Sequence, residues 1–227
     1  MNRKLNLALW KLFRTKRIWR NFPNNTICND IQFWDLFMVM YEDNRAILSM
    51  REKYNIYRLV KQTAKIEGDI AEVGVYKGGS AKIIAEVKGN KRLHLFDTFE
   101  GMPSVEASID LHKKGDFNDT SIESVKGYLA KYKDVFFYKG YFPSSTEGTD
   151  CPKLKYSFVN LDVDIYESTK SSLEFFYDRI NKGGMILSHD YGAISCPGVK
   201  KAFDEFFIDK PETVIELWDS QCLVVKI

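Results

Sequence analysis

The stretch Asp69-Ile-Ala-Glu-Val-Gly-Val-Tyr-Lys-Gly-Gly-Ser80 decides how the rest of the chain is interpreted. Residues 69–75 have the apolar pattern of a short buried strand, and Ser80 to Val87 has the pattern of a helix. The glycines between them let the backbone come close to a ligand. Their spacing differs from the G-x-G-x-x-G of dinucleotide-binding proteins, which disfavours a nicotinamide cofactor. Taken alone, the turn also fits an ordinary strand-to-helix connection.

Strand and helix patterns alternate from this turn onward. The expected strands are residues 69–75, 92–97, 135–138, 156–162, 183–188, 213–218 and 222–227, and the expected helices are residues 80–87, 121–133, 168–180 and 197–207. Such alternation predicts a parallel sheet with helices on both faces. The last two strands are joined at Asp219-Ser220, which is too short for a parallel crossover, so they must pair antiparallel. We therefore expect a doubly wound, mostly parallel seven-stranded α/β sheet with a C-terminal antiparallel hairpin.

Residues 1–65 precede the alternating pattern. We predict helices over residues 31–49 and 50–65, and divide the chain into an N-terminal helical extension (1–65) and a catalytic domain (66–227). The aromatic content of the extension predicts an acceptor cap or a contact within a homo-oligomer. Its first 20 residues are basic, with leucines at helical spacing. They fit a helix on a membrane surface or one that covers the domain or a second subunit, and we favour the second interpretation.

The composition limits the classes of function. The chain has 227 residues, 44% of them hydrophobic, and a net charge of +2, which fits one sizeable domain and no nucleic-acid partner. No apolar run reaches the ~18 residues that span a bilayer. The four cysteines form no C-x-x-C pair. That pattern predicts reduced thiols in a cytoplasmic protein, with neither a disulfide framework nor a zinc site.

Acidic residues follow several of the expected strands, where ligands bind in a doubly wound sheet. Asp97 stands 23 residues after Gly74, a spacing at which a carboxylate can accept hydrogen bonds from the ribose hydroxyls of a nucleoside cofactor. Asp162-Val-Asp164 and His189-Asp190 end two strands that we expect to be neighbours. Carboxylates with an imidazole can hold Mg²⁺ or Mn²⁺, which would lower the pKa of a bound hydroxyl.

These motifs together resemble the macrocin-type O-methyltransferases, within the class I S-adenosylmethionine-dependent methyltransferases. The resemblance rests on Glu72-Val-Gly-Val-Tyr-Lys-Gly-Gly-Ser80, Leu95-Phe-Asp-Thr-Phe-Glu-Gly-Met-Pro103, Asn160-Leu-Asp-Val-Asp-Ile-Tyr-Glu-Ser-Thr169, Gly183-Gly184 and His189-Asp-Tyr-Gly192, and covers roughly residues 68–207. It implies a class I methyltransferase fold, S-adenosylmethionine and Mg²⁺, and methylation of a sugar hydroxyl. The acceptor would be a glycosylated natural product or a surface-glycan precursor.

The resemblance also assigns roles to residues. It implies cofactor contacts at Glu72, Gly74, Tyr76, Ser80, Asp97, Thr98, Phe99, Asp116, Phe117 and Asp162. Residues 100–120 would include a mobile lid over the substrate. It implies metal ligands at Asp162, His189 and Asp190, and a catalytic group of Asp164 as general base with Asp162 and His189.

One position departs from the family pattern, which has two adjacent aspartates where this chain has His189-Asp190. A neutral imidazole can still ligate a metal, but it brings less negative charge than a carboxylate and favours Mn²⁺ over Mg²⁺. Two alternatives stay open. Asp162-Val-Asp164 also fits the D-x-D of a metal-dependent glycosyltransferase, and His189 fits a non-catalytic methyltransferase-like module.

Overall fold

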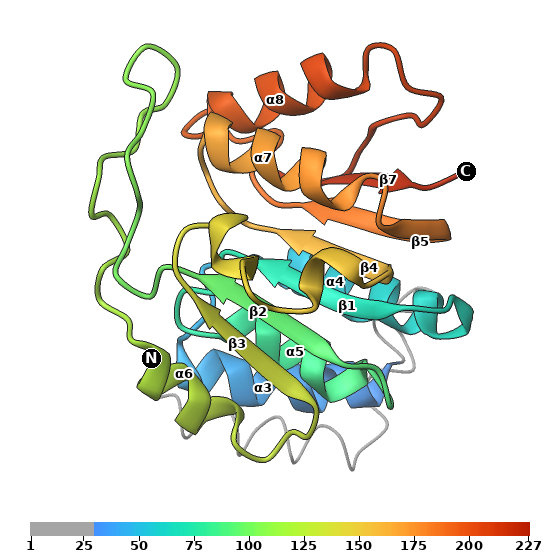
Figure 1. Ribbon diagram of the computed structural model, residues 1–227. Coiled ribbons are helices and arrows are strands. Elements are labelled where there is room, and N and C mark those ends of the chain that lie inside the picture. Colours follow the sequence, from blue (N-terminus) through green and yellow to red (C-terminus); the bar gives the residue numbers. More distant parts are fainter. Residues whose placement is uncertain (1–29) are drawn as a thin grey trace, which may run out of the picture.

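The computed structural model describes residues 30–227, and its centre is one seven-stranded sheet (Figure 1). The strands lie in the order β3-β2-β1-β4-β5-β7-β6. All neighbours from β3 to β5 pair parallel, whereas β7 pairs antiparallel with both β5 and β6. Their bounds are β1 Asp69–Val73, β2 Leu93–Asp97, β3 Val135–Lys139, β4 Tyr156–Leu161, β5 Ile180–Ser188, β6 Ile215–Glu216 and β7 Cys222–Val225. The predicted sheet, including its C-terminal hairpin, is confirmed.

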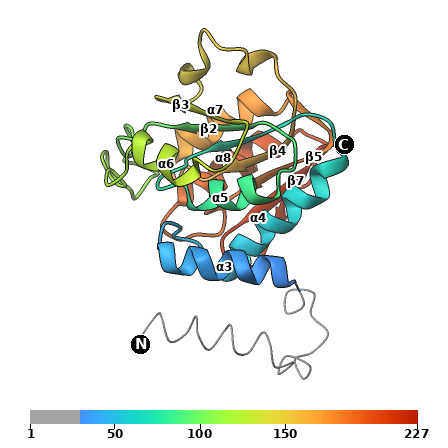
Figure 2. The same cartoon turned by 90° about the horizontal axis from the view of Figure 1, so that it is seen from below.

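Helices cover both faces of this sheet, as the two views show (Figures 1 and 2). On one face α3, α4, α5 and α6 share a hydrophobic cluster with β1 and β2, and on the other α7 and α8 share a second cluster with β4 and β5. The helices are α3 Ile31–Asp43, α4 Met50–Gln62, α5 Gly79–Val87, α6 Ile122–Leu129, α7 Tyr166–Phe176 and α8 Pro197–Phe207, with short 3₁₀ turns η2 Thr63–Lys65, η3 Ser144–Thr146 and η4 Cys151–Lys153.

Several predicted boundaries differ from the structure. The helix expected over residues 31–49 ends at Asp43, and the helix expected to run to Lys133 ends at Leu129. The helix expected to run to Ile180 ends at Phe176, and β5 already begins at Ile180, before the glycine pair expected to open it. A register irregularity between β4 and β5 accommodates this early start. The strand expected over residues 213–218 is only the two-residue β6, whose side chains are exposed.

Helices α3 and α4 belong to the same core as the sheet. Phe33 and Tyr57 are almost fully buried in the cluster that also holds Ile70 of β1 and Ile83 of α5. Ser49 begins α4 with a reciprocal capping box: its hydroxyl accepts from the Glu52 backbone N–H, and the Glu52 carboxylate accepts from the Ser49 N–H. This cap fixes where α4 starts, immediately beside the site described next.

The first 29 residues, with the predicted basic helix and Cys28, lie outside the described part. Among residues 30–227, no helix combines the length and apolar character that crossing a bilayer requires.

Candidate active site

A cavity of about 300 Å³ opens at the carboxyl ends of the parallel strands. Its walls come from the ends of β1, β2, β4 and β5, from residues 45–48 before α4 and from the long loop of residues 98–121 between β2 and α6, with further contributions from the segment after β3 and from the starts of α5, α7 and α8. We call residues 98–121 the covering loop. The cavity is therefore where a doubly wound sheet is expected to bind its ligand.

The glycine turn after β1 forms one wall. Gly74 has a φ of +84°, and a Cβ at this position would lie 1.7 Å from the carbonyl oxygen of Asp162. Only glycine fits, because β1 and β4 come together here and the backbone itself lines the cavity. The space beside Gly74, which any side chain at this position would fill, suits a ligand that lies directly against the main chain.

Asp97, at the end of β2, fixes the shape of this turn. One carboxylate oxygen accepts hydrogen bonds from the backbone N–H groups of Val75 and Tyr76, at 2.7 and 2.9 Å. The other accepts from the Phe99 N–H at 2.5 Å. Asp97 also lines the cavity, so it can meet a ribose while it holds the turn. Three backbone donors hold this carboxylate in one orientation before any ligand arrives.

The predicted cofactor residues divide into two groups. Seven of the ten line the cavity: Gly74, Tyr76, Ser80, Asp97, Thr98, Phe117 and Asp162. Three do not. Glu72 is fully buried in the sheet and accepts a 2.8 Å hydrogen bond from the Asn160 amide. Phe99 packs into the core, and Asp116 binds the His112 ring and the Lys113 backbone N–H.

Burial gives Glu72 an unusual acid–base state. Because the carboxyl has no access to water, and Asp162 and Asp97 add negative charge nearby, its pKa rises to about 8 despite hydrogen bonds from neighbours. Among the described residues, its Oε2 has no hydrogen-bond partner. The raised pKa favours the protonated carboxyl at neutral pH, and Glu72 is not among the residues that line the cavity.

Four polar side chains meet at the ends of β4 and β5, as the sequence predicted: Asp162, Asp164, His189 and Asp190. His189 Nδ1 lies 2.7 Å from an Asp190 oxygen and 3.2 Å from an Asp162 oxygen. Its Nε2 lies 3.2 Å from Glu52 Oε1. Burial alone would lower the pKa of His189, but the three carboxylates outweigh burial and raise the pKa well above its ordinary value.

The residues predicted to hold a divalent metal, Asp162, His189 and Asp190, can be compared with the ligands that such a metal prefers. Asp162 and Asp190 each present one oxygen to His189, which leaves their second oxygens for a hard cation. The imidazole fits such a cation less well. Carboxylates only accept hydrogen bonds, so Nδ1 of His189 needs a hydrogen to bond Asp190 and keeps no lone pair for a metal. Nε2 lies 3.2 Å from Glu52 but forms no hydrogen bond among the described residues. The geometry thus favours His189 as a hydrogen-bond donor that positions the two acids.

Asp164 lies close to two other carboxylates at these strand ends. Burial and the neighbouring Asp162 and Asp190 carboxylates hold its pKa well above the ordinary value. An ionised carboxylate with a raised pKa is a stronger proton acceptor than an exposed aspartate. Its place in the cavity wall therefore suits a general base.

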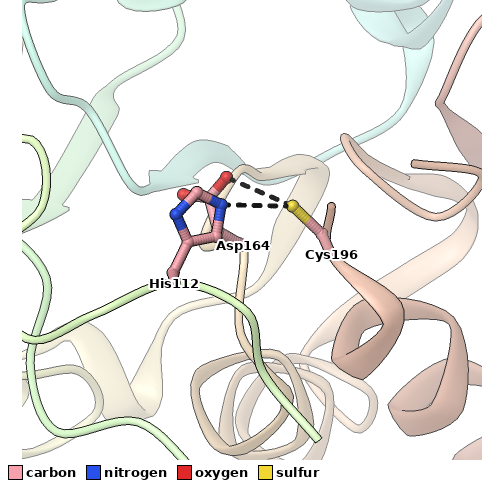
Figure 3. Close-up of side chains that lie close together, drawn as sticks. All are labelled: His112, Asp164 and Cys196. Atoms are coloured by element: carbon pink, nitrogen blue, oxygen red, sulfur yellow. Dashed lines mark hydrogen bonds between the residues drawn. The ribbon is translucent and has the colours of Figure 1, made fainter. Parts of the chain in front are cut away.

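Three residues at the site were not predicted. The first is Glu52 of α4, whose carboxylate takes part in the capping box and accepts a 2.7 Å hydrogen bond from the Ser220 hydroxyl. The same carboxylate lies beside the His189 ring. His112 of the covering loop and Cys196, the residue before α8, line the cavity beside Asp164 (Figure 3). The capping-box pattern was visible in the sequence, whereas nothing local indicated that Glu52 also reaches a strand end.

The covering loop is held over the cavity at two places. Near its end, Asp119 accepts a 2.6 Å hydrogen bond from the Tyr76 hydroxyl, and Thr120 donates to the Tyr76 carbonyl at 2.6 Å. In its middle, Asp110 accepts a 2.9 Å hydrogen bond from the Tyr166 N–H, the first backbone donor of α7. Ile165, the residue immediately before α7, makes no capping hydrogen bond with its own side chain. Asp110 thus caps this helix from outside its own sequence.

Comparison with known sequences agrees with this arrangement. Residues 46–218 match the macrocin O-methyltransferase (TylF) family. The 8-demethyl-8-(2,3-dimethoxy-α-L-rhamnosyl)-tetracenomycin-C 4′-O-methyltransferase of Streptomyces olivaceus is 31% identical over 147 residues, 58% of this chain and 56% of that relative. The demethyldecarbamoylnovobiocin O-methyltransferase of Streptomyces niveus is 26% identical over 182 residues, 71% and 67% of the two chains. The chain thus spans little more than half of the first relative.

Solved structures share the fold. The O-methyltransferase NovP superposes with a TM-score of 0.68 at 23% identity, covering 80% of this chain and 82% of NovP. The calicheamicin methyltransferase CalS11 gives 0.66 at 18% identity, covering 93% and 90%. These likenesses confirm the class I methyltransferase fold expected from the sequence. Because the family match takes in most of the chain, the glycine turn and the acidic strand ends included, this protein belongs to the macrocin O-methyltransferase family.

Proposed function

We propose that the protein transfers a methyl group from S-adenosylmethionine to a sugar hydroxyl of a glycosylated small molecule or a surface-glycan precursor. The observation that carries the proposal is the single cavity in which Gly74 and Asp97 share the wall with Asp162, Asp164 and Asp190. The turn that would hold the cofactor and the carboxyl that would accept the proton thus face the same cavity. The names of both curated relatives describe O-methylation of natural products, and one describes a rhamnosyl acceptor.

S-adenosylmethionine supplies an electrophilic methyl group on a sulfonium centre. The Gly74 turn admits the cofactor against the main chain, and Asp97, already oriented by three N–H groups, accepts from the ribose hydroxyls. Asp164 takes the proton of the acceptor hydroxyl as the oxygen attacks. Held between these groups, donor and acceptor are aligned for direct transfer, so positioning supplies much of the catalysis.

Metal assistance is part of the proposal. Asp162 and Asp190 would hold Mg²⁺ or Mn²⁺ through the oxygens that His189 leaves open, and the cation would lower the pKa of the acceptor hydroxyl. His189, fixed by Glu52, keeps the two carboxylates in place. We expect chelation by EDTA to lower turnover, and added Mg²⁺ or Mn²⁺ to restore it. Turnover that is indifferent to EDTA would remove the metal from the mechanism.

The division of the chain also enters the proposal. We propose that residues 1–65 shape the acceptor side, since residues 45–48 already line the cavity. A contact within a homo-oligomer is the second role proposed for this extension, and sedimentation of the full chain would show whether one forms.

The decisive experiment has two parts. Binding of S-adenosylhomocysteine is measured by calorimetry, and transfer from labelled S-adenosylmethionine is measured on rhamnosylated acceptors. We expect Asp164→Asn to lower turnover at least a hundredfold while cofactor affinity stays within about threefold. Full activity of this variant would exclude Asp164 as the base.

Absence of cofactor binding at millimolar concentration would reject the methyltransferase proposal, and stabilisation by nucleotide-sugars instead would support a glycosyltransferase. Binding without turnover on any acceptor would support a non-catalytic module.

A further inference from the structure

Three side chains from separate segments meet beside the acidic strand ends (Figure 3). His112 comes from the covering loop, Asp164 follows β4, and Cys196 precedes α8. The Cys196 sulfur lies 3.5 Å from His112 Nε2 and 3.8 Å from Asp164 Oδ1. One donor atom of each residue lies within 4.8 Å of the other two, and all three residues line the cavity.

These separations match the edges of a tetrahedral metal site. Zinc lies about 2.3 Å from a thiolate sulfur and about 2.0–2.1 Å from an imidazole nitrogen, so two such ligands at a tetrahedral angle are roughly 3.5 Å apart. The observed separation of sulfur and Nε2 equals this value, and that of sulfur and Oδ1 is only slightly longer. The third pair, Nε2 and Oδ1, lies within 4.8 Å.

The neighbours of the cluster prepare it for a cation. Asp116 Oδ2 lies 3.2 Å from His112 Nδ1, and a hydrogen on Nδ1 that bonds this carboxylate leaves the Nε2 lone pair directed at Cys196. The Ser195 hydroxyl lies 3.5 Å from the sulfur, at a distance where it can donate to a thiolate. A carboxylate behind a histidine is the usual support for a metal-binding imidazole.

The Cys196 sulfur faces two polar groups at once, a nitrogen of the His112 ring and an oxygen of the Asp164 carboxyl. A divalent ion would satisfy all three groups together.

We propose that His112, Asp164 and Cys196 form a binding site for a borderline divalent metal ion such as Zn²⁺, with its fourth position open to the cavity. The mixed nitrogen, oxygen and sulfur ligands select against Mg²⁺, whereas Asp162 and Asp190 offer oxygens alone. An ion bound to Asp164 Oδ1 would lower the pKa of this carboxyl and weaken it as a proton acceptor, so an occupied site would oppose the proposed methyl transfer. The sequence had predicted that its scattered cysteines make no zinc site, but the fold places Cys196 beside His112. The proposal goes beyond the methyltransferase function and does not depend on it.

The chemistry of the thiol makes binding sensitive to pH. Zn²⁺ binds a thiolate and not a thiol, so Cys196 must lose its proton as the metal binds. The metal–sulfur bond replaces the S–H bond, and the proton goes to solvent or buffer. Affinity should therefore fall as the pH falls. A bound ion would also join the covering loop to the ends of β4 and α8.

The test is titration of the chelator-treated full-length protein with Co²⁺ in excess Mg²⁺, which occupies oxygen-only sites. We expect a thiolate-to-cobalt charge-transfer band and the strong visible bands of tetrahedral Co²⁺, both abolished by one equivalent of Zn²⁺. Cys196→Ser should remove the charge-transfer band, and His112→Gln should weaken Zn²⁺ binding at least tenfold. Cys151→Ser is the matched control, because Cys151 also lies near a histidine, His94, whose nitrogens already face Asp69 and Tyr138.

Each outcome decides the proposal. A cobalt complex without a charge-transfer band, or a band that persists in Cys196→Ser or disappears in Cys151→Ser, would overturn it. Thermal unfolding of each variant confirms folding, and His112→Gln, on a loop, provides a second test if Cys196→Ser does not fold. Cofactor binding is measured in parallel. A protein that binds Zn²⁺ but no S-adenosylhomocysteine would retain this site and lose only the proposed methyltransferase function.

Discussion

The two ends of the cavity are built in different ways. At the glycine-turn end, around Gly74 and Asp97, a carboxylate meets three backbone N–H groups, two from the turn after β1 and one from the residue two positions after Asp97. At the acidic end, around Asp162, Asp164 and Asp190, carboxylates face one another and an imidazole. The first end is complete without a ligand. The second gathers excess negative charge, and the difference suggests that a cation or a substrate completes it.

Gly74→Ala should break the glycine-turn end outright, and we expect the largest effect of any change here. The new methyl would lie 1.7 Å from the Asp162 carbonyl at a φ of +84°, so β1 and β4 must separate. We expect a loss of roughly 3 kcal/mol or more in unfolding free energy and no measurable cofactor binding. Gly89→Ala is the control, because its φ is +62° but nothing lies within 4 Å. It should cost only about 1 kcal/mol, measured by urea unfolding. Equal losses in the two variants would show that the clash is unimportant.

Asp97→Ala should damage the same end less severely. It removes the acceptor of three backbone N–H groups, and we expect about 2–3 kcal/mol lower stability together with at least tenfold weaker binding of S-adenosylhomocysteine. Asp97→Asn keeps one acceptor oxygen, so its stability and its affinity for S-adenosylhomocysteine should lie between those of the unaltered protein and those of Asp97→Ala. Urea unfolding and calorimetry measure both quantities. Weaker binding of S-adenosylhomocysteine at unchanged stability would mean that Asp97 contacts the ligand but does not stabilise the glycine turn.

Glu52→Gln tests the acidic end through pH. Burial would raise the pKa of Glu52, but His189 and the Ser220 and Ser49 hydrogen bonds outweigh burial and lower it from 4.5 to about 2. The ionised carboxylate therefore stabilises the fold above about pH 4.5, and that stabilisation is lost as the pH falls toward 2. We expect Glu52→Gln to be about 2 kcal/mol less stable at neutral pH, with the gap closing in acid. Glu100→Gln, which breaks an exposed pair with Lys139, should leave stability nearly unchanged. A gap independent of pH would exclude the ion pair as its cause.

The glycine-turn end could be predicted from the sequence because its parts are local. Residues 69–80 contain the strand, the turn and the helix start, and Asp97 follows at the end of the next strand. Parallel neighbours are also adjacent in this topology, so the meeting of Asp162 with Asp190 followed from the strand order. The direction of a side chain is harder to predict: Glu72 is fully buried on a central strand and does not line the cavity, so its cofactor contact stays a prediction.

The acidic end was harder to predict because long-range packing assembles it. Glu52 and His189 are 137 positions apart, and His112 and Cys196 are 84 apart. No spacing rule connects such pairs, since each depends on how α4, the covering loop and α8 pack around the sheet. A histidine within a polar loop and a lone cysteine before a proline have no local signature of a joint role.

The covering loop connects the two ends, and Asp110→Ala tests that connection with the smallest expected effect. The Asp110 carboxylate caps α7 and fits against Gly198 of α8, where a Cβ would come within 2.2 Å of its Oδ1. Loss of the cap should cost about 1 kcal/mol, whereas Asp110→Asn, which keeps an acceptor, should cost a few tenths. The loop should then be cut faster by a protease that cleaves after lysine at Lys113 or Lys114, while its attachment at Asp119 and Tyr76 persists. Because that attachment belongs to the glycine-turn end, cofactor affinity should change little and acceptor turnover should fall. If affinity and turnover fell equally, the loop would act on the whole cavity, and the two ends could not be treated as separately built.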